Sequence, residues 1–145
     1  MNVQVQKLNP DAIVPTFGSE QAAGADLYAL LDAPAIIKPG ETLLIKTGLA
    51  MAIPNGYVGL IFARSGLASK RGLAPANKVG VIDSDYRGEL MVALHNHSTE
   101  NQTVEPKERI AQLAIIPYLH PSFEVTDSLD ETKRGTGGFG STGTK

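Results

Sequence analysis

The sequence predicts an all-β domain, either a sandwich or a barrel of short strands. Apolar or alternating runs recur along the 145 residues, and glycine and proline turn signals separate them. Many short strands joined by such turns are typical of sandwiches and barrels. The predicted strands lie in residues 3–8, 27–31, 35–38, 42–47, 57–63, 79–82, 89–94 and 110–118.

Two segments depart from this pattern. Residues 65–71 contain Leu-Ala and end on basic side chains, which predicts one or two helical turns. From residue 127 to 145 the only aliphatic residue is Leu129 and glycine is frequent, so this segment cannot bury enough apolar area to order itself. We therefore expect a β domain over residues 1–126 and a flexible glycine-rich arm over residues 127–145.

Composition and charge exclude several classes of function. The chain has no cysteine, which excludes disulfides, a thiolate nucleophile and a cysteine-based zinc site. Its net charge of -2 gives no general attraction for nucleic acid. Because no stretch reaches the roughly 18 apolar residues of a membrane span, we expect a soluble, cytoplasmic protein that binds neither nucleic acid nor membrane.

The most informative segment is residues 80–88, Gly-Val-Ile-Asp-Ser-Asp-Tyr-Arg-Gly. An apolar strand carries Asp83 into a turn, and Asp85 and Tyr86 follow. An acid beside an aromatic ring at a strand end suits a pocket, because the acid handles protons or metal while the ring stacks. A plain β-hairpin is the alternative, since Asp and Ser begin turns and Gly88 permits positive φ.

Other polar groups stand near predicted strand ends. Arg64-Ser65-Gly66 is either an anion site at a helix start or an ordinary Ser N-cap beside a solvent-exposed Arg. Asp26, taken alone, is a turn acid. Gln112 interrupts an apolar run, and simple alternation places it and Arg109 on different faces of their strand.

Residues 135–140 match the dinucleotide pattern G-x-G-x-x-G, but the chain ends five residues later, so no helix can follow. We reject that interpretation. Glycine-rich backbone still approaches phosphate closely, and Arg134, Ser141 and Thr142 add donors, so the segment suits an anion clamp; a plain disordered tail is the alternative. His95 and His97 share one strand face without a third ligand nearby, which predicts surface histidines.

Five segments taken in order resemble the five motifs of the trimeric dUTPase family. They are residues 23–27 (Ala-Gly-Ala-Asp-Leu), 64–66, 80–88, 109–113 (Arg-Ile-Ala-Gln-Leu) and 134–143. The resemblance extends from about residue 3 to residue 143. Glu108 stands where Asp is common and Thr136 where Ala is common, and neither departure removes a group that the chemistry needs.

The resemblance implies a distorted jelly roll and a homotrimer whose three active sites are shared between subunits. One subunit would supply the Asp83–Tyr86 hairpin, which would form the uracil pocket, a second the phosphate-binding segments and a third the arm. The implied reaction converts dUTP and water into dUMP and pyrophosphate with Mg²⁺. It would keep uracil out of DNA and supply dUMP for thymidylate synthesis.

The resemblance also implies roles for individual residues. Asp83 would be the base that activates water, and Asp26 would hold Mg²⁺ through a water, together with substrate phosphates. Arg64 would position its segment or the substrate. The phosphate contacts would come from Ser65, Gly66, Gln112, Arg134, Gly140, Ser141 and Thr142.

Base and sugar recognition fall to another set of side chains. Val81, Ile82 and Met91 would form a wall that rejects the thymine methyl by clash. Asn77 and main-chain groups would read the uracil edge, Tyr86 would exclude a 2′-hydroxyl, and Phe139 would stack on the base. A dCTP deaminase, and a nucleotide-binding module without turnover, are the alternative functions.

Overall fold

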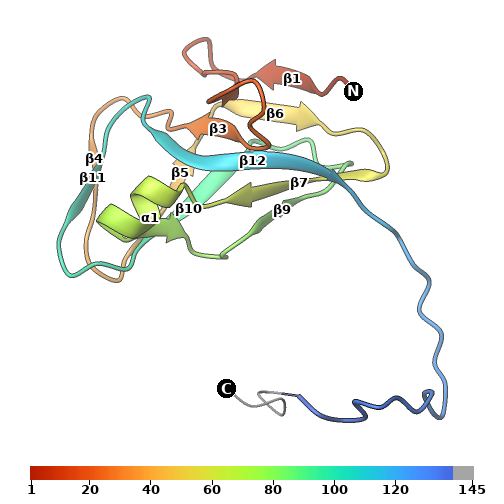
Figure 1. Ribbon diagram of the computed structural model, residues 1–145. Coiled ribbons are helices and arrows are strands. Elements are labelled where there is room, and N and C mark those ends of the chain that lie inside the picture. Colours follow the sequence, from red (N-terminus) through yellow and green to blue (C-terminus); the bar gives the residue numbers. More distant parts are fainter. Residues whose placement is uncertain (139–145) are drawn as a thin grey trace.

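The computed structural model describes residues 1–138, which form strands and one short helix (Figure 1). This confirms the predicted all-β class with one helix. The strands are β1 (Gln4–Lys7), β2 (Thr16–Phe17), β3 (Ala25–Tyr28), β4 (Ala35–Ile37), β5 (Thr42–Lys46), β6 (Leu49–Ala52), β7 (Tyr57–Phe62), β8 (Leu73–Pro75), β9 (Gly80–Ile82), β10 (Met91–Asn96), β11 (Gln102–Val104) and β12 (Arg109–Pro117).

These strands pair in four antiparallel sheets. The largest has the order β2-β3-β12-β7-β9, and a three-stranded sheet has the order β5-β10-β8. The pairs β1-β6 and β11-β4 complete the arrangement. Within residues 1–138 no sheet closes on itself, so the predicted sandwich fits and the barrel is not closed.

One hydrophobic core joins the four sheets. Its fully buried members include Leu27 from the five-stranded sheet, Leu94 from the three-stranded sheet, Leu49 from β6 and Val104 from β11, each 0% exposed. Burying a side chain of this size contributes about 1.5–3 kcal/mol relative to leaving it in water. Because all four sheets contribute, the core fixes how the sheets lie against one another.

Helix α1 (Ser65–Arg71) has the bounds that the sequence predicts. Leu67 points into the core, and Lys70 and Arg71 occupy the last turn, where cations suit the helix dipole. Gly72 ends the helix in the left-handed conformation, with φ of 65°. Its seven residues make α1 far too short to cross a membrane, and residues 1–138 contain no other helix.

Four strands have weak sequence signals and are not predicted. The sequence of β6 is Leu-Ala-Met-Ala, which has little intrinsic strand preference, yet it pairs with β1 over four residues. Strand β2 has two residues, β8 contains Pro75 and lies at a sheet edge, and β11 carries two polar residues. These four segments are extended because each pairs with another strand of its sheet, and not because of local preference.

Residues 80–88 do not form a β-hairpin, so the expectation of a hairpin, whether plain or as the uracil pocket, is wrong. Strand β9 pairs with β7, whereas β10 pairs with β5 and β8. The loop between β9 and β10 therefore crosses from one sheet to another. The crossing leaves a gap between the two strands that backbone pairing does not fill.

The chain leaves the body after β12, which ends at Pro117. Figure 1 shows residues 118–138 running away from the sheets without regular structure. Four large apolar side chains of this segment are almost fully exposed, namely Leu119, Phe123, Val125 and Leu129. The division into a domain ending at residue 126 and an arm beginning at residue 127 stays a prediction.

Asn96 at the end of β10 links two of the sheets. The side chain is fully buried, and its Nδ2 donates to the carbonyls of Ile37 at 2.8 Å and Glu100 at 2.7 Å. Its Oδ1 accepts from the backbone N–H of Ser98 at 2.9 Å and from the Ser98 hydroxyl at 2.7 Å. The amide therefore holds β4 and the loop after β10 in place.

We predict that Asn96→Ala lowers the free energy of unfolding by about 2–4 kcal/mol, because buried carbonyls lose their donor. Urea unfolding at fixed protein concentration measures the change. Asn101→Ala, at an exposed position of the same loop, is the matched control and is expected to be nearly neutral. A loss below about 1 kcal/mol for Asn96→Ala would contradict the assigned role.

Candidate active site

Asp26 on β3 is a buried carboxylate held by two guanidinium groups. Arg64 Nε donates to Oδ1 at 2.8 Å, and Arg109 Nη1 donates to Oδ2 at 3.2 Å. Asp26 is only 3% exposed, and a buried charge is tolerated when it is paired and hydrogen-bonded. Asp26 is therefore an anchor inside the sheet and not a turn acid.

Arg64 connects helix α1 to the sheet. It occupies the N-cap position, and its Nη1 also donates to the Arg109 carbonyl at 3.3 Å. The alternative of a solvent-exposed Arg beside a Ser N-cap is wrong, because Ser65 is the first helical residue and no side chain caps the helix. Ser65 and Gly66 are exposed, and a Cβ at Gly66 would meet nothing within 4 Å, so a ligand has room to approach this backbone.

A β-bulge brings Arg109 and Gln112 to the same face. Arg109 pairs with Tyr28 and Gln112 with Asp26, with a register shift between residues 109 and 111. One extra residue reverses the alternation of side chains, so the expectation of opposite faces is wrong. Cross-strand partners share a face, which places Gln112 beside the Asp26 carboxylate.

We call Asp26, Arg64, Arg109 and Gln112 the arginine cluster. Two guanidiniums and one carboxylate give it one net positive charge. Gly24 also shapes the cluster, because a Cβ there would lie 3.3 Å from the Gln112 Cβ. With Ser65 and Gly66 beside it, the cluster presents cations, an amide and open backbone, which are the groups that hold phosphate.

A second group of predicted residues lines the gap between β9 and β10. One pocket of about 200 Å³ is lined by Asn77, Val81, Ile82 and Met91 among others. The adjoining pocket of about 280 Å³ shares the last three and adds Asp83 and Tyr86. We call the two pockets the β9–β10 groove. The structure therefore brings together all the residues predicted for base and sugar recognition that lie within residues 1–138.

Leu44 on β5 is a lining residue that the sequence does not reveal. It borders both pockets of the β9–β10 groove, and its side chain is 56% exposed. The run Thr-Leu-Leu-Ile-Lys in β5 has no clean alternation, so sequence alone cannot assign Leu44 to a face.

Tyr86 is fixed by its own loop. Its ring lies directly over Gly88, where a Cβ would approach the Tyr86 Oη to 2.4 Å. The hydroxyl donates to the Glu89 carbonyl at 3.1 Å, and the Tyr86 N–H donates to the Asp83 carbonyl at 3.2 Å. Gly88 does not have a positive φ, so it is required for space and not for backbone conformation.

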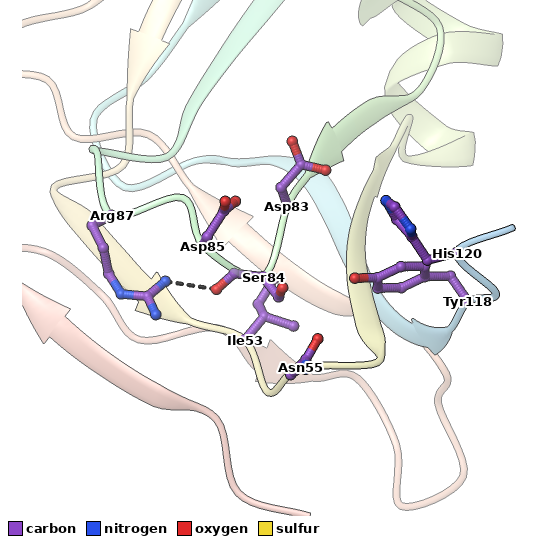
Figure 2. Close-up of a pocket in the computed structure, with 8 residues that line it drawn as sticks. All are labelled: Ile53, Asn55, Asp83, Ser84, Asp85, Arg87, Tyr118 and His120. Atoms are coloured by element: carbon purple, nitrogen blue, oxygen red, sulfur yellow. Dashed lines mark hydrogen bonds between the residues drawn. The ribbon is translucent and has the colours of Figure 1, made fainter. Parts of the chain in front are cut away.

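Asp83 also borders a larger polar pocket of about 790 Å³. Figure 2 shows Asp83 and Asp85 on one side of it and Tyr118 and His120 on another. Asp85 lies in the turn itself, as expected. Asp83 is exposed at the boundary between the apolar groove and this polar pocket.

The arginine cluster lies around the inner strands β3 and β12 of the five-stranded sheet, whereas Asp83 follows the edge strand β9. Gln112 pairs with Asp26, whereas Ile82, which precedes Asp83, pairs with Gly59. Asp83 thus lies three strands across and about four residues along from Asp26. Strand spacings of about 4.8 Å and rises of about 3.4 Å per residue give a separation of about 20 Å. The backbone positions of Asp26 and Asp83 are therefore well separated within one chain.

The arm residues stay apart from both groups. Arg134 is exposed, and its Nε donates to the Gly137 carbonyl at 2.8 Å. Phe139, Gly140, Ser141 and Thr142 lie outside the described residues. Their predicted contacts with substrate stay predictions.

The described residues fit Mg²⁺ only through water. Residues 1–138 contain no group of three or more metal-ligating side chains. Both Asp26 oxygens accept a guanidinium N–H, so direct ligation would displace an arginine. A carboxylate oxygen has a second lone pair, and a metal-bound water can donate to it, which suits an ion that keeps waters and shares substrate phosphates.

The histidine pair lies outside these groups. The His95 and His97 rings pack edge to face, with their centroids 4.3 Å apart. The His95 Nδ1 lies 2.8 Å from the Thr42 hydroxyl. Desolvation, and then the charges of Lys78 and His95, lower the pKa of the His97 side chain. Among the described residues this pair has no third ligand.

Comparison with known proteins gives a consistent result. The dUTPase family model matches residues 10–143. A deoxyuridine 5'-triphosphate nucleotidohydrolase of Desulfitobacterium hafniense is 53% identical over 90% of this chain and 87% of its own length. Another from Nautilia profundicola is 48% identical over 99% of both chains.

Solved structures agree as well. A Staphylococcus bacteriophage 80alpha dUTPase with dUpNHpp has a TM-score of 0.85 and 30% identity over 99% of both chains. A dUTPase mutant from phage phi11 of S. aureus, solved with a structural Mg(II) ion, has a TM-score of 0.78 and 27% identity over 88% of this chain and 98% of its own. Fold and site define a β-sandwich protein with an anion-attracting cluster and a small groove. The chain belongs to the dUTPase family.

We predict that Asp26→Asn lowers the free energy of unfolding by about 2–3 kcal/mol, because two guanidiniums lose their counter-charge in a partly buried setting. Chemical denaturation at fixed protein concentration measures the loss. Asp32→Asn removes an exposed carboxylate and serves as the control, with an expected effect near zero. Equal stability of the two variants would show that Asp26 is not an anchor.

Proposed function

We propose that this chain hydrolyses dUTP to dUMP and pyrophosphate by attack of water on the α-phosphorus. The observation that carries the proposal is the position of Asp83, exposed where the β9–β10 groove meets the polar pocket. A base bound in the groove would bring its phosphates toward this carboxylate. Membership of the dUTPase family supports the same reaction.

The groove is narrow enough to discriminate among bases. Val81, Ile82 and Met91 line both of its pockets and form an apolar wall, against which an added methyl group would clash. Asn77 lines the inner pocket, and its amide offers both a donor and an acceptor to a uracil edge. Cytosine presents a donor where uracil presents an acceptor, and a mismatched buried pair costs about 1–3 kcal/mol.

Tyr86 supports recognition of deoxyribose. Its ring is packed on Gly88 and its hydroxyl is bonded to Glu89, so it cannot move aside easily. A rigid ring at the groove mouth leaves no space for a 2′-hydroxyl. The proposed selectivity for a deoxyribonucleotide follows from that rigidity.

Catalysis needs a base and neutralisation of charge. Asp83 would accept a proton from the attacking water. Arg109 and Gln112, with the open backbone of Ser65 and Gly66, would bind the phosphates, and Arg64 would hold that segment in place. Mg²⁺, when bound, supplies charge neutralisation at the phosphates, and Asp26 would hold one of its waters.

We also propose that the complete site forms between copies in a homotrimer. The arginine cluster and Asp83 are about 20 Å apart in one chain, by strand spacing and rise. A neighbouring copy can bring its arginine cluster to the polar pocket beside Asp83. A third copy would supply residues 134–143, whose predicted role is closure over the γ-phosphate.

We predict that Asp83→Asn lowers kcat for dUTP by at least about 10³-fold, because the amide cannot accept the proton of the attacking water. Affinity for a non-hydrolysable dUTP analogue is expected to change by less than about threefold, since the wall and Tyr86 are unaltered. Pyrophosphate release and calorimetric titration measure the two quantities. Asp85→Asn, in the same turn, is the matched comparison and is expected to retain most turnover.

Two results would contradict this assignment. Absence of pyrophosphate release by the unaltered protein with dUTP and Mg²⁺ would contradict the reaction itself. Unchanged turnover in Asp83→Asn would contradict the choice of base while leaving the reaction standing.

Sharing of the site is tested by mixing two inactive variants. Asp83→Asn lacks the base and Arg109→Met lacks a phosphate contact. Random mixed trimers pair an intact groove with an intact cluster in about a quarter of their sites, so activity should return to about 25% of the unaltered level. The assay is dUTP turnover after co-expression of the two tagged chains. No recovery above the separate variants would place both groups within one subunit's site.

A further inference from the structure

The loop from Asp83 to Leu90 has a supporting group that the proposed chemistry does not use. The loop crosses between two sheets, so no ladder of backbone hydrogen bonds fixes it. Leu90 is bonded through its backbone to Thr47 and Leu49, and the rest of the loop depends on turn bonds and side chains. Tyr86 holds the second part of the loop, through its contacts with Gly88 and Glu89.

Arg87 holds the first part of the loop, residues 84–86. Its Nη1 donates to the Ser84 carbonyl at 2.7 Å and to the Tyr86 carbonyl at 2.9 Å. Figure 2 shows the guanidinium folded back toward Ser84, with Asp83 beyond it. One nitrogen thus bridges the two carbonyls that flank Asp85, and the bridge closes the turn that Asp83 begins.

We propose that Arg87 is a positioning residue for Asp83. The inference rests on the proposed hydrolysis of dUTP. Arg87 does not touch the β9–β10 groove, whereas it lines the polar pocket beside Asp83 and Asp85. One of its bonds goes to the Ser84 carbonyl, next to Asp83, and the other to the Tyr86 carbonyl, so its loss should let the turn and the Asp83 carboxylate shift while the base wall stays in place.

The size of the effect follows from geometry. A displacement of about 1 Å in a catalytic group can cost about 10²-fold in rate. The two bonds are exposed, so each contributes little to stability, and the protein should fold without them. A loss of rate with retained folding and retained affinity separates positioning from a general structural role.

The test uses Arg87→Met, which keeps the aliphatic stem and removes the donors. We expect kcat for dUTP to fall about 10- to 100-fold, with KM changed by less than about threefold. Arg87→Lys restores a cationic donor and should recover kcat to within about fivefold of the unaltered enzyme. The control is Lys7→Met, which removes a cation that is bonded to the Pro10 carbonyl and lines neither the groove nor the polar pocket, and should change neither constant.

A second readout does not depend on turnover. Hydrogen exchange of a peptide covering residues 83–90 should be several-fold faster in Arg87→Met, because the Tyr86 N–H bond to the Asp83 carbonyl opens more often. Exchange elsewhere and unfolding by urea should match the unaltered protein.

Unchanged kcat in Arg87→Met would overturn the proposal. A rise in KM with kcat retained would also overturn it, since that result would make Arg87 a binding residue. If the unaltered protein does not hydrolyse dUTP, the proposed function fails by itself. Unchanged exchange in residues 83–90 would then still reject the role of Arg87 in holding the turn.

Discussion

The rest of the site depends on one buried ionic contact, in which the Asp26 carboxylate is shared by Arg64 and Arg109. Arg64 belongs to the start of α1 and Arg109 to the start of β12, so the carboxylate on β3 joins three elements. Neither guanidinium could lie so close to the other without the charge between them. The contact therefore brings two guanidinium groups together and fixes how each of them is oriented.

Sequence reasoning recovered the elements that local chemistry decides. The bounds of α1 follow from its Leu-Ala pair and its basic end, and the runs that became β5, β7 and β12 carry strong strand patterns. Val81, Ile82 and Tyr86 of the groove were also predicted, because they stand within one motif of the family, residues 80–88. Features that local chemistry determines can be predicted from the sequence, and so can residues that stand in a family motif.

The remaining features depend on pairing between distant segments. The bulge before Ala111 changes the face of Arg109, and no local signal distinguishes it from regular alternation. The separation of β9 from β10 depends on which partner each strand finds, and so does the part that Leu44 plays in the groove. Gly88 was assigned to backbone conformation, whereas its function is to make room for a ring that only the fold places there.

The β9–β10 groove lies between two sheets and not within one, and this has a mechanical consequence. Its width is the distance between the sheets, so it can change without breaking any backbone hydrogen bond of either ladder. The stiffness of the walls then comes from the shared core, through residues such as Leu94 that never touch a ligand. Substitutions that soften this distant packing would loosen the choice among bases while every lining residue stayed the same.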